Sequence, residues 1–380
     1  AFLLMGVLGI LVGRLNDRFG PRGIVALTAL FYGAGYILLS RLDSVGQLYL
    51  FYGVVVGIGL SSIDVIPLTT TARWFVRRRG TMTGVVKVGT GAGQMIMPMT
   101  AGLLIVHFGW RYACIGVGII AFVLIVGSGQ LLRRDPGQMG LLPDGDRESG
   151  KGIVQGSQEG LTLRGALRTG QFWVIFTIYL VAVGCLMTVM VHIVPHSQDS
   201  GLDPIKAAGV LSTIGGVSML GRITTGLAID RIGNKKSMLI CFTLLILCLL
   251  WLRVAGEMWM LYLFAAFYGV AHGGLFVLIS PTVAWLFGMG SHGVLIGLVA
   301  FSGTLGGSLG PVMAGRIFDT VQSYQPVFLI LIGMGIVGLI LTLFLKPVAV
   351  SGLDGSVLSQ KYLCKSPVIE RPPGGGRSGP

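Results

Sequence analysis

Eleven apolar stretches dominate this 380-residue sequence. They cover residues 1–12, 23–40, 45–72, 81–106, 112–132, 172–194, 207–229, 237–256, 258–287, 293–315 and 326–345. All but the first approach or exceed the roughly 17–25 residues that a helix needs to cross the hydrocarbon core of a bilayer. Only 11% of the residues are charged, against about 25% in soluble domains. The sequence therefore excludes a soluble globular protein and predicts an all-α membrane protein.

The first apolar stretch is shorter than the others. At 1.5 Å per residue it reaches only about 18 Å, and the sequence begins with Ala rather than Met. We expect that an N-terminal tail, one whole helix and part of the next precede this stretch. The predicted fold is then a pair of six-helix bundles with the first helix and part of the second missing.

The basic residues follow the pattern of membrane topology. Sixteen Lys and Arg residues lie in one set of alternate gaps between the apolar stretches and five in the other, with five more near the C-terminus. The positive-inside rule places the richer set in the cytoplasm, together with the C-terminus. The net charge of +13 therefore indicates a multi-pass protein of the cell membrane in contact with lipid, and no nucleic-acid partner is expected.

A long polar interruption suggests the domain organisation. We expect an N-terminal helical bundle over 1–132, a central cytoplasmic loop over 133–170, a C-terminal helical bundle over 171–346 and a disordered cytoplasmic tail over 347–380. Because one chain supplies both bundles, it can enclose a site between them, and we expect a monomer.

A short motif occurs twice, as GRLNDRFG over 13–20 and as GLAIDRIG over 226–233. The shared positions are Gly13, Asp17, Arg18 and Gly20 in the first copy and Gly226, Asp230, Arg231 and Gly233 in the second. Pro98 and Pro311 are separated by the same spacing as the two copies. The pattern indicates two parallel repeats of six helices, an arrangement that places a substrate site between the repeats at the membrane midplane.

These motifs resemble the major facilitator superfamily. Further segments are similar to its monocarboxylate-transporter-like branch, which includes relatives of bacterial oxalate:formate antiporters: RWFVRRRG over 73–80, GWR over 109–111, DPGQMGLLPDG over 135–145 and FW at 172–173. The resemblance covers about residues 1–346. It implies a secondary active transporter that works by alternating access.

The repeated motif is a candidate gate. We expect Asp17 and Asp230 to pair with basic residues of adjacent helices, so that breaking the contact biases the inward- against the outward-facing state. The alternative is that the basic residues of the motif only set topology. Helix breakers such as Pro67 and Pro281 are interpreted as pivots of the moving bundles, or as plain packing features.

Ionisable residues inside apolar stretches are costly, so each is a candidate functional residue. Four stand out: Asp64, Lys87, Arg222 and His272. Arg222 offers a permanently charged fork that fits a carboxylate, and the alternative is a side chain that snorkels to water. In monocarboxylate-transporter relatives a similar arginine of the eighth helix holds the substrate carboxylate, which the resemblance extends to Arg222.

The other three have two interpretations each. Asp64 and Lys87 lie at equal depth on consecutive helices and can form a structural ion pair, or Asp64 carries the coupling proton and Lys87 binds substrate. His272 either contributes to substrate binding and proton coupling or is a structural histidine. His192 and His196 are interpreted as surface or vestibule groups.

Two departures from the family limit the substrate. Ser218 stands where some monocarboxylate transporters carry Asp, and residues 293–315 lack the Lys of oxalate antiporter relatives. A monoanion therefore fits better than a dianion.

The sequence predicts a transporter of a small monocarboxylate, coupled to H⁺. Anion exchange of the oxalate:formate type and efflux of a non-carboxylate compound are the alternatives. No metal cluster, nucleophile elbow or phosphate loop is present in the sequence, so no cofactor, metal or enzymatic activity is expected.

Overall fold

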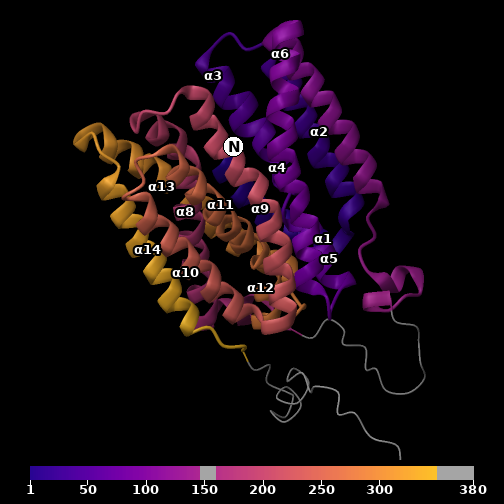
Figure 1. Ribbon diagram of the computed structural model, residues 1–380. Coiled ribbons are helices and arrows are strands. Elements are labelled where there is room, and N and C mark those ends of the chain that lie inside the picture. The colour runs from indigo at the N-terminus through magenta and orange to yellow at the C-terminus, as the bar shows by residue number, and fades with distance from the viewer. Residues whose placement is uncertain (146–159, 349–380) are drawn as a thin grey trace, which may run out of the picture. The chain divides into compact units, whose positions relative to one another are not determined.

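Long apolar helices make up most of this computed structural model (Figure 1), which describes residues 1–145 and 160–348 except for the side chains of Pro98 and Met99. The first repeat contains α1 (Phe2–Phe19), α2 (Pro21–Leu39), α3 (Val45–Leu48), η1 (Tyr49–Val56), α4 (Gly57–Leu60), α5 (Val65–Trp74) and α6 (Arg79–Leu131). Short elements follow: η2 (Pro136–Met139), η3 (Pro143–Gly145) and α7 (Leu163–Leu167). The second repeat contains α8 (Gly170–Asp199), α9 (Pro204–Ile232), α10 (Asn234–Leu252), α11 (Met258–Val277), α12 (Ile279–Phe287), α13 (His292–Val321) and α14 (Gln325–Leu343).

Every apolar stretch of the sequence forms helix, although not all form independent spans. Eight helical segments of the described chain are long and apolar enough to cross a membrane. The stretches over 1–12, 81–106 and 207–229 lie in α1, α6 and α9, which carry Asp17, Lys87 and Arg222, respectively. The apolar stretches over 81–106 and 112–132 form two helices within α6, which meet at Gly109, where the backbone is non-helical with φ +80°. This left-handed conformation favours glycine.

Four helices of the described chain begin at polar caps. The side chains of Ser44, Thr162, Thr169 and Asp203 accept hydrogen bonds from backbone amides in the first turns of α3, α7, α8 and α9. The amide of Lys206 lowers the pKa of Asp203 below its usual value, since a hydrogen bond to the carboxylate favours its charged form.

The loop predicted over 133–170 contains η2, η3 and α7, and the helix that follows begins at Gly170. Of that loop and of the tail predicted from residue 347, residues 146–159 and 349–380 lie outside the described part.

The helix bounds repeat with the same spacing as the sequence motif. At that spacing α2 and α10 correspond at both ends, and so do the spans Val45–Trp74 and Met258–Phe287. Gly20 and Gly233, one at the start of each equivalent helix, have φ angles of +83° and +88°. Figure 1 shows α2 beside α6 and α10 beside α14, which are equivalent pairs. The repeat is therefore a property of the fold as well as of the sequence.

The repeated architecture extends to single hydrogen bonds. Nε of Arg22 donates to the carbonyl oxygen of Leu132 at 2.9 Å, just past the end of α6. At the equivalent positions of the second repeat, Nζ of Lys235 donates to the carbonyl oxygen of Leu345 at 3.4 Å, past the end of α14. A cation at a helix carboxyl end satisfies free carbonyls and opposes the helix dipole.

The two repeats meet along helices with small residues. Helix α1 packs against α13, and α6 packs against α9, within the compact unit Ala1–Pro347. A Cβ built on Gly226 would lie 2.6 Å from the carbonyl oxygen of Gly80, and one built on Gly297 would lie 2.9 Å from that of Gly9. Glycine is required at these places because the backbones themselves are in contact. We call the end of the unit that carries Asp17 and Asp230 the motif end.

Candidate functional site

A cavity of about 320 Å³ lies between the two repeats. Residues of α1, α4, α5 and α6 line it from one side and residues of α8, α9, α11, α12 and α13 from the other. Among the described residues that line it, only Asp64, Lys87 and Arg222 are charged. Three of the four ionisable residues singled out in the sequence therefore meet in one cavity, between elements far apart in the chain.

Arg222 is buried in the wall of this cavity, with 1% of its surface exposed. Its Nη1 donates to Oγ of Ser218 at 3.1 Å, and that hydroxyl donates to the carbonyl oxygen of Gly215 at 2.6 Å. Nε of Arg222 has no hydrogen-bond partner within the described chain. The side chain does not snorkel to water, and it keeps donor capacity that an anion in the cavity would satisfy.

Gly91 fixes the position of the Arg222 guanidinium. A Cβ built on Gly91 would collide with Nη1 of Arg222 and would lie 2.6 Å from Cγ of Met219. Because Gly91 lies on α6 and Arg222 on α9, the arginine occupies space that any larger residue at 91 would take from it. Gly91 is thus a positioning residue, which the sequence analysis did not identify.

Asp64 and Lys87 form the ion pair that the sequence suggested, with 2.5 Å between Nζ and Oδ1. The two partners differ in exposure: 6% of the Lys87 side chain is exposed, against 36% for Asp64. Nζ of Lys87 also lies 5.8 Å from the centroid of the Phe276 ring, within the range of a cation–π contact. The lysine is therefore enclosed while the carboxylate is accessible.

Asp64 stands at a break in its helix that the sequence analysis did not predict. The apolar stretch over 45–72 forms η1, then α4 as far as Leu60, then a turn, and α5 only from Val65 onward. Pro67, which cannot donate a hydrogen bond to residue 63, follows the break. Leu60, Ser61, Ile63 and Asp64 all line the cavity, so this discontinuity brings polar groups to the site. The equivalent span in the second repeat is divided at Leu278, ahead of Pro281.

His272 lies outside the cavity lining. Its ring packs against that of Phe276, with 5.2 Å between centroids, and Phe276 lines the cavity whereas His272 does not. The imidazole is 1% exposed, and neither ring nitrogen has a hydrogen-bond partner among the described residues. The proposed roles of His272 in binding and proton coupling gain no support from this placement.

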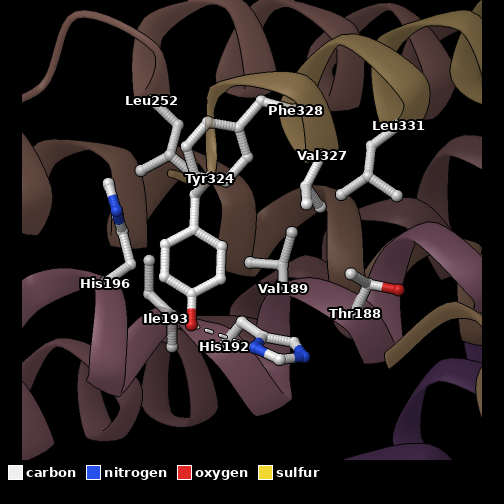
Figure 2. Close-up of a pocket in the computed structure, with 10 residues that line it drawn as sticks. All are labelled: Thr188, Val189, His192, Ile193, His196, Leu252, Tyr324, Val327, Phe328 and Leu331. Atoms are coloured by element: carbon white, nitrogen blue, oxygen red, sulfur yellow. Dashed lines mark hydrogen bonds between the residues drawn. The ribbon is translucent and has the colours of Figure 1, made fainter. Parts of the chain in front are cut away.

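A second, much smaller cavity of about 10 Å³ lies between α8, α10 and α14 (Figure 2). Nε2 of His192 lies 3.0 Å from the carbonyl oxygen of Pro311, and Nδ1 lies 3.2 Å from Oη of Tyr324. A carbonyl only accepts, so Nε2 carries the proton and the tyrosine donates to Nδ1. Burial raises the pKa of Tyr324 above its usual value, which keeps this phenol protonated. His192 and His196 are thus packed among helices rather than displayed on a surface, and the space beside them holds about one water.

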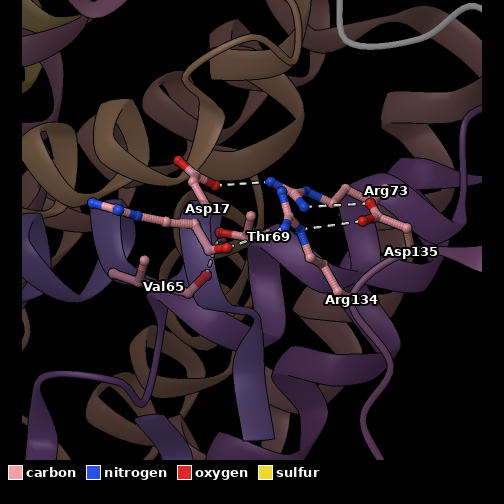
Figure 3. A network of polar contacts seen from close by, with 7 residues as sticks. Asp17, Val65, Thr69, Arg73, Arg134 and Asp135 are labelled. Carbon is pink, nitrogen blue, oxygen red and sulfur yellow. Dashed lines mark hydrogen bonds and ion pairs between the residues drawn. The ribbon is translucent and has the colours of Figure 1, made fainter. Parts of the chain in front are cut away.

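At the motif end, Asp17 joins three elements (Figure 3). Its Oδ1 accepts from Nη2 of Arg73 at 2.8 Å, and the same guanidinium lies 3.3 Å from Asp135. The carboxylate also lies against the first amides of α13, at Gly293 and Val294. The prediction that Asp17 pairs with a basic residue is confirmed, and its contact with α13 ties the first repeat to the second. We call this set of contacts the Asp17 latch.

Asp230 ties the repeats together at the equivalent place, but without a basic partner among the residues described. Oδ1 accepts from the amide of Gly80, and Oδ2 accepts from the amide and the hydroxyl of Thr81, at 2.8, 2.8 and 2.6 Å. These are the first amides of α6, so the carboxylate meets the positive end of the helix dipole. Among the described residues, two backbone amides and a hydroxyl stand in place of the basic side chain that was expected for Asp230. We call this set the Asp230 latch.

The other motif residues support the two latches. Gly13 touches the backbone of Gly293 much as Gly226 touches that of Gly80. Arg18 stacks on the Phe19 ring at 5.1 Å, and its carbonyl oxygen accepts from Arg134. Gly20 and Gly233 form the turns, while Arg231 is exposed.

The segment after α6 binds the first repeat and extends the Asp17 latch. Oδ2 of Asp144 accepts from the amides of Val76 and Arg77 at 3.0 and 2.9 Å. Nε1 of Trp74 donates to the carbonyl oxygen of Arg133 at 2.9 Å. Asp135 and Asp144 belong to a sequence segment noted for its resemblance, yet its role as a brace for residues 73–77 could not be foreseen from sequence alone.

Comparison with known proteins gives one family. The sequence matches the model of the Major Facilitator Superfamily over residues 1–227 and 217–369. It is 27% identical over 293 residues to MFS-type transporter 1 of Ophiocordyceps sp. (strain BCC 1869), a match covering 76% of this chain and 62% of that protein. It is also 27% identical over 327 residues to monocarboxylate transporter 13 of Bos taurus, covering 83% and 71% of the two chains. The chain thus spans less than two thirds of the first relative.

Solved structures show the same fold. The human organic anion transporter MFSD10 superposes with a TM-score of 0.69 at 16% identity, covering 90% of this chain and 81% of that one. The Escherichia coli fucose:proton symporter FucP also gives 0.69, at 13% identity, with 91% and 90% covered.

Proposed function

This chain belongs to the major facilitator superfamily of transporters, and on that premise we propose that it carries a small monocarboxylate across the membrane together with a proton. The observation that carries the proposal is Arg222, a buried guanidinium in the cavity wall whose Nε has no partner in the described chain. A carboxylate is the natural partner of such a fork. The similarity to a monocarboxylate transporter points the same way.

The charges of the cavity favour a monoanion. Lys87 and Arg222 contribute two positive charges and Asp64 one negative charge, so the empty cavity has one excess positive charge. A buried excess charge is unfavourable, and one carboxylate would neutralise it. While Asp64 is ionised, a dianion would reverse this imbalance.

Asp64 is the proposed proton carrier. It is the single carboxylate of the described cavity wall, and its side chain is accessible while its partner Lys87 is enclosed. Protonation of Asp64 would break the ion pair and release Lys87 to the substrate anion. Proton and anion would then bind together, which is the requirement for symport. Lys87 becomes a second substrate-binding residue in this scheme.

The two latches support alternating access as the transport cycle. Both hold the repeats together at the motif end, and the Asp230 latch joins α9 to α6, the two helices that carry Arg222 and Lys87 of the cavity. We propose that the bundles over 1–132 and 171–346 rock about the cavity, so that opening the latches exposes it at the motif end. The distribution of basic residues favours the cytoplasm for this end and the cell membrane as the location.

Uptake into proteoliposomes tests the proposal. Purified protein is expected to accumulate a labelled monocarboxylate when the vesicle interior is alkaline, and Arg222→Gln should lower uptake at least 30-fold, since a charge-assisted contact is worth about 2 kcal/mol. Arg316→Gln, on the exposed part of α13, is the control. Unchanged uptake by the Arg222 variant contradicts the proposal. Uptake only into vesicles preloaded with a second anion assigns exchange instead of symport.

A further inference from the structure

The cavity is much larger than a carboxylate site requires. Its volume of about 320 Å³ falls in the range of about 300–1,000 Å³ that accommodates drug-sized ligands. The charged residues Asp64, Lys87 and Arg222 occupy only one part of the lining. A two- or three-carbon acid bound at those charges would leave most of this space unfilled.

The remaining wall is mostly apolar and begins beside the charged residues. Phe276 makes the cation–π contact with Lys87, so its ring borders both parts of the cavity. Leu60, Val183, Met187 and Ile296 continue the apolar lining from three different helices. Apolar walls from both repeats favour an apolar occupant over water.

The cavity also has length. On α6 the lining residues run from Lys87 through Thr90 to Gln94, which is about 10 Å along the helix axis. An occupant with its carboxylate between Lys87 and Arg222 therefore has room for a body as long as an aromatic ring and its linker. The hydroxyl of Thr90 and the amide of Gln94 add hydrogen-bonding groups along this side.

We propose that the substrate is an amphipathic monocarboxylate, with an aromatic or long apolar body that lies against Phe276 and Met187. This inference rests on the proposed function, because it assumes that Arg222 holds the carboxylate. It adds that selectivity comes from the apolar part of the cavity. Affinity should therefore increase with the size of the apolar body of the acid, and the carboxylate alone should not set it.

Binding measurements on the full chain in lipid nanodiscs test the inference. The compounds are lactate, 3-phenylpropanoate and 3-phenylpropan-1-ol, which keeps the apolar body but lacks the carboxylate. Isothermal titration should give 3-phenylpropanoate a dissociation constant at least about tenfold lower than that of lactate. The alcohol should bind much more weakly than 3-phenylpropanoate, since it offers Arg222 no charge.

Variants locate the effect. Phe276→Ala should weaken 3-phenylpropanoate about tenfold and lactate less, whereas Phe267→Ala, which removes a ring that is 52% exposed on the same helix, should change neither. Met187→Gln, on α8, gives an independent measurement if the Phe276 variant does not fold. Equal or tighter binding of lactate overturns the inference while the proposed function stands. Failure of both acids to bind, with no uptake of either, overturns both.

Discussion

Asp17 and Asp230 hold equivalent positions in the two repeats, and each touches the first turn of a helix in the other repeat. The Asp17 latch depends on Arg73, which binds Asp17 and Asp135 together. The Asp230 latch uses the amides of α6 and the Thr81 hydroxyl. One motif has thus kept its geometry across the repeats while its electrostatic support has diverged.

The reason for the difference is visible one helix away. In the second repeat, the position equivalent to Arg73 is taken by Leu286, which is 1% exposed. No cation reaches Asp230 from that position, so hydrogen bonds to the helix terminus provide the attachment. The Asp17 latch should therefore be the more sensitive to charge and the Asp230 latch the more sensitive to loss of hydrogen bonds.

Removing the shared cation should have the largest effect. In Arg73→Gln, two carboxylates that are 20% and 34% exposed lose their common partner, and the closed motif end should be destabilised by about 3 kcal/mol. Spin labels at Phe19 and Ile232, exposed residues of the two repeats, would report a shift to longer distances. Arg111→Gln is the control, because its ion pair with Asp43 is exposed and worth well below about 1 kcal/mol. Equal effects of the two variants would contradict the proposed role of Arg73.

Asp230→Ala should have a smaller effect. It removes three hydrogen bonds at the start of α6, which should shift the equilibrium between closed and open motif ends by about 2 kcal/mol, or roughly 30-fold. Hydrogen exchange of the peptide containing Gly80 and Thr81 would detect the freed amides. Asp203→Ala, which removes a cap at the opposite end of α9, is the matched control. Unaltered exchange at residues 80 and 81 would show that the latch does not form in solution.

A change in ionic strength should have the smallest of the three effects, and it should weaken the Asp17 latch more than the Asp230 latch. Raising the ionic strength screens the Asp17–Arg73–Asp135 contacts, partly exposed as they are, by an expected few tenths of a kcal/mol. Hydrogen bonds to neutral amides depend less on salt. The spin-label distance distribution of Asp230→Ala, which retains only the Asp17 latch, should therefore respond to salt more than that of Asp17→Asn. A larger response in Asp17→Asn would reverse the comparison.

Much of the helical architecture followed from the sequence, because apolar length and a repeated motif are local patterns. The Asp64–Lys87 pair could be predicted from equal depth on consecutive helices, and burial of Arg222 from its place inside an apolar stretch. The break before α5 has a local signal in Pro67, yet which turn opens depends on the neighbouring helices. The partner of Asp230 was missed because backbone amides leave no trace in residue identity.

The positions of the Asp17 latch residues in the chain also bear on biosynthesis. Asp17, Arg73 and Asp135 all precede residue 136, so their ionic network can assemble while the second repeat is still being synthesised. The carboxylate that later receives α13 is then already charge-paired and oriented when that helix emerges. Asp230 differs, because its partners on α6 are synthesised before Asp230 itself. The Asp230 latch can therefore form as soon as α9 is in place. The two latches would thus be completed in a fixed order as the chain is inserted into the membrane. The Asp230 latch would form first, and the contact between Asp17 and α13 would form second.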